Sequence, residues 1–190
     1  MHDKHTTLKD QLILAGIDEI NTHGIANFSI RRVATACDVS CAAPYRHFKD
    51  KNGLIAAIID YVNEQWAQRK EEILKGCGSS LREQIIEISL GYIRFLMEKP
   101  YYRSVLMLKD EEFDNLYHKK RTQFGSLSQT LEHQLFTASG FPEDIWKRKV
   151  LVFRSLIFGT LFLFDAGEFE YNDTNMEHIR FTLNREFDVL

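Results

Sequence analysis

The spacing of apolar residues constrains this chain more than any other feature, because it is helical along nearly the whole length. Apolar side chains recur three or four positions apart, which is the period of an amphipathic helix, and not at every second position as in a strand. The 190 residues contain only three prolines and no repeated or low-complexity segment, so little interrupts this pattern. The sequence predicts an all-α protein.

The first fifty residues predict three short helices. Thr6-Thr7 is expected to cap the first helix, and His23-Gly24 is expected to end it. Ser29 is a good cap for a second, short helix. The segment 37–40 has the composition of a tight turn, because Asp38 tolerates a left-handed backbone better than most residues. Two short helices are thus expected to meet across this turn.

The third helix carries a proline. Its sequence is SCAAPYRHF over residues 40–48, and Ser40 is the expected cap. Pro44 then falls at the fourth helical position, where its missing N–H forfeits only the first hydrogen bond of the helix. The helix could also begin one or two residues later. In either case the proline constrains how the helix starts without abolishing it.

The remainder of the chain predicts a long helix followed by a helical bundle. Asp50 is expected to cap the long helix, and Gly76-Cys77-Gly78 is expected to end it. We expect an N-terminal domain of residues 1–52 and a C-terminal domain of residues 53–190. Further helices are expected near 80–98, 101–109, 112–138, 143–166 and 173–188.

The sequence lacks the short motifs that mark several common enzyme classes. The chain has no HExxH, CxxC, GxSxG or glycine-rich phosphate loop, so we expect no enzyme, no cofactor and no metal. The three cysteines have no pairing pattern, and each is expected to be a small buried side chain. The start, MHDKHTTLKDQ, has no apolar run behind a basic head, and Arg154 interrupts the longest apolar tract. We therefore expect a cytoplasmic protein that does not span a membrane.

Two short helices joined by a tight turn are the pattern of a helix-turn-helix, whose second helix enters the major groove of DNA. Small side chains at Cys41, Ala42 and Ala43 would let the backbone approach the groove. The net charge of −3 gives no global basic signal, but residues 28–51 carry five basic and two acidic side chains. This local excess of about three positive charges favours DNA, and a merely solvated face is the alternative interpretation.

Residues from about 12 to 54 resemble the DNA-binding domain of TetR-type transcriptional regulators. Asp38 stands where that family usually has glycine, and Pro44 where it usually has an aliphatic residue, although the string APYRHF resembles one subgroup. The resemblance implies an N-terminal three-helix helix-turn-helix domain and a C-terminal helical bundle for dimerisation and ligand binding. The matching positions are Leu12–Ile17, Gly24, Ser29, Arg31, Val33-Ala34, Val39-Ser40, Tyr45, Phe48, Lys51 and Leu54.

The resemblance also implies a homodimer that binds the two half-sites of a palindromic operator in double-stranded DNA, each through one helix 40–48. Phe48 is expected to join the core, and Tyr45 to serve both the core and the DNA. The expected phosphate contacts are Ser29, Tyr45, His47 and Lys51, the residues nearest the bases are Cys41, Ala42, Ala43 and Arg46, and Arg31 and Ser40 complete the expected DNA-binding set.

By the same resemblance, the C-terminal helices supply both the dimer contacts and an effector site. Effector binding would change the spacing of the two reading helices and release the operator, so that the chain acts as a repressor. Aromatic residues suggest an apolar or aromatic small molecule, although such residues also build cores. The expected dimer residues are Val150, Phe153, Ile157, Leu161 and Phe164, and the expected effector residues are Phe95, Tyr101, Tyr102, Phe113, Tyr117, Phe124 and Phe158.

Two other classes remain open. A helical adaptor or coactivator of the same fold would bind a protein partner instead of DNA, and residues 1–60 allow this because seven basic side chains are balanced by seven acidic ones. A helical enzyme would need dispersed catalytic residues such as Glu83, Glu87 and His118. Binding to DNA that weakens steeply with salt separates a DNA-binding protein from an adaptor.

Overall fold

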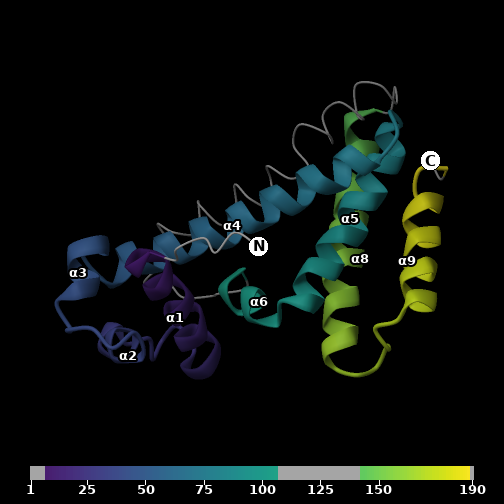
Figure 1. Cartoon of the computed structure of the whole chain (residues 1–190). Coiled ribbons are helices and arrows are strands. Elements are labelled where there is room, and N and C mark those ends of the chain that lie inside the picture. The colour runs from purple at the N-terminus through teal and green to yellow at the C-terminus, as the bar shows by residue number, and fades with distance from the viewer. Residues whose placement is uncertain (1–6, 107–141, 189–190) are drawn as a thin grey trace. The chain divides into compact units, whose positions relative to one another are not determined.

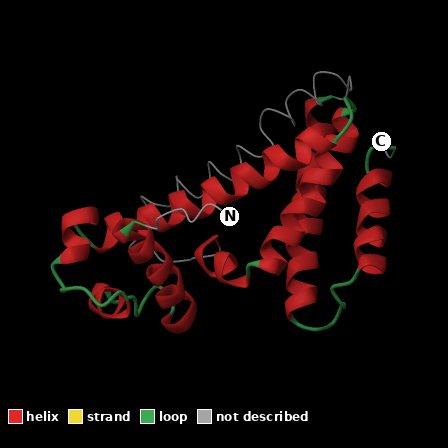
Figure 2. Cartoon of the chain, viewed as in Figure 1, coloured by secondary structure: helices red, strands yellow, loops and turns green. Residues whose placement is uncertain are grey.

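The computed structural model describes residues 7–106 and 142–188, and their regular secondary structure is entirely α-helical (Figure 1). Figure 2 shows short loops between consecutive helices within each of these two ranges. The prediction of an all-α chain with an N-terminal helix-turn-helix is confirmed. None of the helices in these ranges is long and apolar enough to cross a bilayer. The helices are α1 (Leu8–His23), α2 (Ile30–Ala36), α3 (Ala43–Phe48), α4 (Lys51–Gly76), α5 (Leu81–Glu98), α6 (Pro100–Leu106), α8 (Glu143–Asp165) and α9 (Asp173–Arg185).

Most helices of the second half lie where the sequence predicts them. The segments expected near 80–98, 143–166 and 173–188 are α5, α8 and α9, with ends that differ by a few residues. Helix α6 begins at Pro100, one residue earlier than expected, because the fixed φ of proline suits the first helical position. The helix expected over 112–138 lies outside the described residues.

The described residues form two units. Unit 1 contains residues 7–65 and 99–106, and unit 2 contains residues 66–98 and 142–188. Helix α4 therefore contributes its first part to unit 1 and its last part to unit 2.

Helix α1 is fixed at both ends by local interactions. Thr7 caps it as predicted: the Asp10 N–H donates to Thr7 Oγ1 (3.2 Å), and the Thr7 N–H donates to Asp10 Oδ2 (3.1 Å). The hydrogen bonds from Thr7 lower the pKa of Asp10. At the other end Gly24 has φ 71°, which residues with a Cβ rarely adopt.

The core of unit 1 lies between α1 and the first part of α4. Gly16 permits their close approach, because a Cβ at this position would lie 2.5 Å from Ile58 Cδ1. Helix α6 also packs on α1 within this unit. The fully buried side chains of this core include Leu12, Ile17, Ile20, Leu54, Ile55, Ile58 and Ile59.

Unit 2 is built around α5, which packs against α8 and α9. Gly91 brings α5 close to the end of α4, since a Cβ there would lie 2.2 Å from Ile73 Cδ1. Arg82, near the start of α5, donates to the Asn184 carbonyl oxygen (2.7 Å) and to Asp188 Oδ1 (2.8 Å). A side-chain cation thus satisfies the carbonyl end of α9.

Candidate nucleic-acid interface

Helix α2 and the turn that follows it form as the sequence predicts. Ser29 caps α2, with its Oγ accepting from the Arg32 N–H (3.4 Å). Asp38 has the expected left-handed backbone, with φ 54°. The Val39 N–H then donates back to the Ala34 carbonyl oxygen (3.0 Å), which closes the turn. The chain leaves α2 at a defined angle because this turn is hydrogen-bonded on its inner side.

Helix α3 begins two residues after the start that a cap at Ser40 would give, which is the later start that the sequence also allows. Ser40 is not its cap: the helix starts at Ala43, after Ala42, which makes no side-chain capping bond. The Ala43 N–H donates to the Ser40 carbonyl oxygen (2.9 Å), so residues 40–43 form a turn before the helix. Pro44 is the second residue of α3, where an N–H has no partner within the helix in any case. The proline therefore costs this helix no hydrogen bond.

The junction between α3 and α4 is tight and holds α3 in place. Lys49 has φ 68°, which ends α3, and Asp50 caps α4 as predicted by accepting from the Gly53 N–H (2.7 Å). A Cβ on Gly53 would lie 1.9 Å from the Phe48 carbonyl oxygen. Only glycine fits at residue 53 without movement of the backbone.

Most predicted DNA contacts lie on an exposed face of α3 and the turn before it. Tyr45 is 52% exposed, and Phe48 is buried as expected. Ala43 is also buried, so its side chain packs inside the unit and does not reach a base. Cys41 is exposed, which corrects its assignment as a buried cysteine. Ser40, Cys41, Ala42, Arg46, His47 and Arg31 are exposed, and Ser29 and Lys51 are half-buried.

Two shallow hollows flank α3 and connect it with the start of α1. One, of about 290 Å³, is lined by Leu8, Arg46 and His47 among others. The other, of about 580 Å³, is lined by Lys9, Tyr45 and Arg46 among others. Lys9 is exposed, so a cation outside the predicted set lies beside α3. Sequence reasoning misses Lys9 because it is distant from α3 along the chain.

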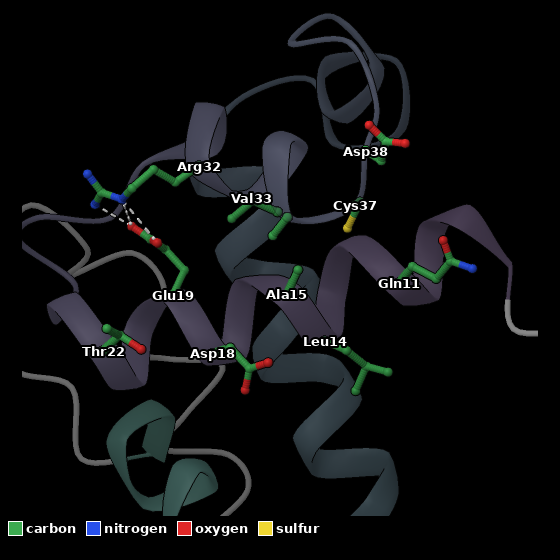
Figure 3. A pocket seen from close by; sticks show the side chains of 11 residues that line it. Gln11, Leu14, Ala15, Asp18, Glu19, Thr22, Arg32, Val33, Cys37 and Asp38 are labelled. Atoms are coloured by element: carbon green, nitrogen blue, oxygen red, sulfur yellow. Dashed lines mark hydrogen bonds and ion pairs between the residues drawn. The ribbon is translucent and has the colours of Figure 1, made fainter.

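A buried carboxylate lies behind this surface and is paired with an arginine of α2 (Figure 3). Glu19 is 7% exposed and accepts from Arg32 Nε at 2.9 and 3.1 Å, and from the Arg32 terminal nitrogen NH2. Burial alone would raise the pKa of Glu19, but the hydrogen bonds from Arg32 and Ser29 and the charge of Arg32 outweigh it, so the pKa is lowered.

This pair changes the charge that composition assigns to the interface. Arg32 is one of the five basic residues of the segment 28–51, and although its side chain is exposed, its charge is paired with the buried Glu19 carboxylate. The basic surface is therefore one charge smaller than the sequence predicts. The sequence contains a signal for the buried carboxylate but not for its partner: Glu19 lies on the apolar stripe of α1, between Ile17 and Ile20.

Metal binding depends on clustered ligands, and thiol reactivity on a lowered pKa. The described residues contain no group of three or more His, Cys, Asp or Glu side chains that could hold a metal ion. Cys37 and Cys77 are half-buried, and burial raises the pKa of both thiols. A raised pKa keeps a thiol protonated, which disfavours nucleophilic attack near neutral pH.

The predicted effector residues divide between the two units. Tyr101 and Tyr102 belong to unit 1, where their rings pack edge to face with centroids 4.7 Å apart. Phe95 belongs to unit 2, where its ring packs against that of Trp66 with centroids 5.3 Å apart. Phe158 is a half-buried residue of α8, while Phe113, Tyr117 and Phe124 lie outside the described residues.

The predicted dimer residues lie mainly on the inner side of α8. Leu161 and Phe164 are buried within unit 2, and Val150, Phe153 and Ile157 are half-buried. Burial against the chain's own helices removes Leu161 and Phe164 from any surface that a partner could touch. The exposed apolar side chains lie elsewhere on α8 and α9: Leu151, Val152, Phe162, Leu163 and Phe181.

Known proteins share this architecture. Residues 12–58 match the family model described as bacterial regulatory proteins, tetR family. A TetR family transcription regulator from Marinobacter aquaeolei VT8 is similar in structure, with a TM-score of 0.71, 21% identity, and coverage of 95% of this chain and 93% of that chain. No curated protein sequence gives a significant match.

Two further solved structures agree with this comparison. NalD from Pseudomonas aeruginosa, the secondary repressor of the MexAB-OprM multidrug efflux pump, has a TM-score of 0.72 and 20% identity, and the match covers 94% of each chain. A protein with unknown function from Rhodococcus sp. RHA1 has a TM-score of 0.74 and 17% identity, with coverage of 97% of this chain and 95% of that chain. At these identities the likeness establishes the fold.

Proposed function

We propose that this chain is a transcriptional regulator that binds operator DNA as a homodimer through α3. The observation that carries the proposal is the exposed face of Tyr45, Arg46 and His47, held on a short helix by a tight turn before it and a tight junction after it. The match of residues 12–58 to the regulator family supports it. Residues 1–52 would form the DNA-binding domain, and the APYRHF string would place the chain in one subgroup of the family.

The exposed residues divide into two proposed roles. The residues nearest the bases are Cys41, Ala42 and Arg46, because they lie at the start and on the open face of α3, whereas the buried Ala43 supports the helix from within. Arginine can bond guanine in the major groove with two hydrogen bonds. The proposed phosphate contacts are Ser29, Arg31, Ser40, Tyr45, His47 and Lys51, and we add Lys9 because it lines the same hollow as Tyr45 and Arg46.

A second copy of the chain is the proposed partner of the apolar residues exposed on α8 and α9. Leu151 and Phe162 of α8 and Phe181 of α9 are 65, 68 and 63% exposed. Large apolar side chains this exposed are typical of an interaction surface. Paired copies would bring two reading helices to two half-sites, whose centres lie about 34–36 Å apart in operators of this kind.

A small-molecule effector would control this activity in the cytoplasm. The support is family likeness: NalD, which shares the fold, is a repressor of a multidrug efflux pump. An apolar or aromatic effector bound by the C-terminal helices would favour a dimer in which the reading helices no longer match the half-site spacing. By linkage, operator binding would weaken effector binding by the same factor.

The test of DNA binding is a salt titration. Fluorescence anisotropy would follow binding of the full chain to duplex DNA from the region flanking its gene, with an unrelated duplex of equal length as the control. The proposal predicts tighter binding to the flanking region and a linear fall of log affinity with log salt concentration. Equal or undetectable affinity for both duplexes would favour the adaptor alternative.

A further inference from the structure

Two adjacent arginines at the start of α2 have different surroundings. Both side chains are exposed, but within residues 7–106 and 142–188 the Arg31 side chain makes no ion pair or hydrogen bond. The Arg32 guanidinium is held by Glu19 of α1 and donates also to the Asn27 carbonyl oxygen. The two arginines carry the same charge, but Arg32 is paired with Glu19 and Arg31 is not.

Glu19 binds the backbone of α2 as well as its side chain. The Ser29 N–H donates to Glu19 Oε1 at 3.1 Å, and the Arg32 Nε–H donates to the same oxygen at 2.9 Å. One buried carboxylate therefore joins the cap residue of α2 and the third residue after it to α1 (Figure 3).

These bonds define what Ser29 can offer to a ligand. Its N–H is taken by Glu19, and its Oγ accepts from the Arg32 N–H. A serine hydroxyl has one proton to donate, and in this arrangement the proton remains for an acceptor outside the protein. A DNA phosphate at this half-buried position would meet the hydroxyl and not the backbone N–H.

The groove beside Arg32 is unfavourable for phosphate. It has a volume of about 590 Å³, lies between α1 and α2, and is lined by Asp18, Glu19 and Asp38 as well as by Arg32 (Figure 3). These four residues carry three negative charges and one positive charge, an excess that disfavours a bound anion. Arg32 therefore lines a groove whose charged residues are mainly acidic.

We propose that Glu19 is a positioning residue for the DNA interface: it fixes the Ser29 hydroxyl for a phosphate and withdraws Arg32 from the DNA, so that Arg31 is the phosphate-binding arginine of the pair. This inference rests on the proposed function and assigns a role within the same interface.

The first experiment compares Arg31→Ala with Arg32→Ala in the full chain, with binding to the gene-flanking duplex measured over a series of salt concentrations. Arg31→Ala should flatten the plot of log affinity against log salt by about 0.9 for each phosphate that is no longer neutralised, or about twice that for a dimer. Arg32→Ala should weaken binding and leave the slope at the wild-type value, because Arg32 neutralises no phosphate. Circular dichroism would confirm that each variant is folded at the assay temperature.

The second experiment is a double-mutant cycle between Glu19→Ala and Ser29→Ala. Glu19→Ala should weaken binding about tenfold, because it leaves the Ser29 N–H without its acceptor and releases α2. In the Ser29→Ala background, Glu19→Ala should reduce the DNA affinity by a smaller factor, since the hydroxyl that Glu19 positions is already absent. Glu19→Gln should retain part of the affinity, because its carbonyl oxygen can still accept from Ser29.

The outcomes separate this inference from the proposed function. If the wild-type chain does not prefer the flanking duplex, both fail. If the wild type binds but Arg32→Ala flattens the salt slope as Arg31→Ala does, Arg32 contacts phosphate and the inference is overturned. The inference is also overturned if the affinity losses of Glu19→Ala and Ser29→Ala simply multiply in the double variant. In that case Glu19 stabilises the fold without acting through Ser29.

Discussion

Gly53 and Phe48 approach so closely that a Cβ on Gly53 would lie 1.9 Å from the Phe48 carbonyl oxygen. This contact joins the start of α4 to the end of α3, and the Gly53 N–H is at the same time bonded to Asp50. A backbone contact therefore fixes the direction of α3 relative to the start of α4, because backbone atoms cannot move aside as a flexible side chain can.

Replacement of Gly53 by alanine is expected to lower the free energy of unfolding by about 1–3 kcal/mol, the usual cost of overpacking. It should also weaken DNA binding, because relief of the clash would shift α3. Thermal unfolding and anisotropy would measure the two effects. Gly76→Ala is the matched control: Gly76 is also a residue of α4, nothing lies within 4 Å of a Cβ placed there, and stability should not fall. Equal results for the two variants would contradict the role of the junction.

Alanine at Gly16 should be destabilising and should be rescued at its contact partner. The new Cβ would lie 2.5 Å from Ile58 Cδ1 but 3.4 Å from Ile58 Cγ1. Ile58→Val removes Cδ1, at a usual cost of about 0.5–1.5 kcal/mol when made alone. The double variant should therefore be more stable than the sum of the single changes predicts, as measured by denaturant unfolding. Strict additivity would show that α1 and α4 do not meet at these residues.

The Glu19–Arg32 pair predicts a component of stability that is lost in acid. The pKa of Glu19 in the folded state lies below its ordinary value of 4.5, so the folded state binds this proton less readily than the unfolded state. The contribution is complete above about pH 4.5 and disappears as pH falls through the lower folded pKa. The difference in thermal midpoint between wild type and Glu19→Gln should shrink on acidification. A difference that does not change with pH would contradict the pairing.

The exposed apolar residues of α8 predict how self-association can be broken. Phe162→Glu is expected to yield a monomer in analytical ultracentrifugation, because a carboxylate would be buried against the second copy. Leu14→Glu is the control, since Leu14 is an exposed apolar residue of unit 1 and should leave the association state unchanged. A Phe162→Glu chain that associates like the wild type would place the dimer contacts on another surface.

Local chemistry made much of the N-terminal unit predictable. The caps at Thr7, Ser29 and Asp50 and the left-handed Asp38 each depend on residues a few positions apart, and a sequence shows such neighbours directly. The cap of α3 is a local exception, although the later start of this helix is among the expected possibilities. Ser40 has the chemistry of a cap, but its carbonyl oxygen accepts the Ala43 N–H in a turn, and the helix begins after it.

The features that could not be predicted depend on contacts between helices that are distant in the sequence. Glu19 and Arg32 are thirteen residues apart on different helices, and only the packing of α1 against α2 brings them together. On α8, apolar residues lie on both sides, so periodicity cannot tell the side that packs within the chain, with Leu161, from the side that remains exposed, with Phe162.

Selection of binding sites from a random duplex library would show whether α3 reads a DNA sequence, on which the proposed function depends. The full chain should enrich an inverted repeat whose half-sites are centred about one helical turn apart or a multiple of it. Arg46→Ala should enrich a sequence altered at one position of each half-site, whereas Lys51→Ala should enrich the wild-type sequence with lower affinity. Enrichment of no sequence by the wild type, or of an unchanged sequence by Arg46→Ala, would contradict base reading by α3.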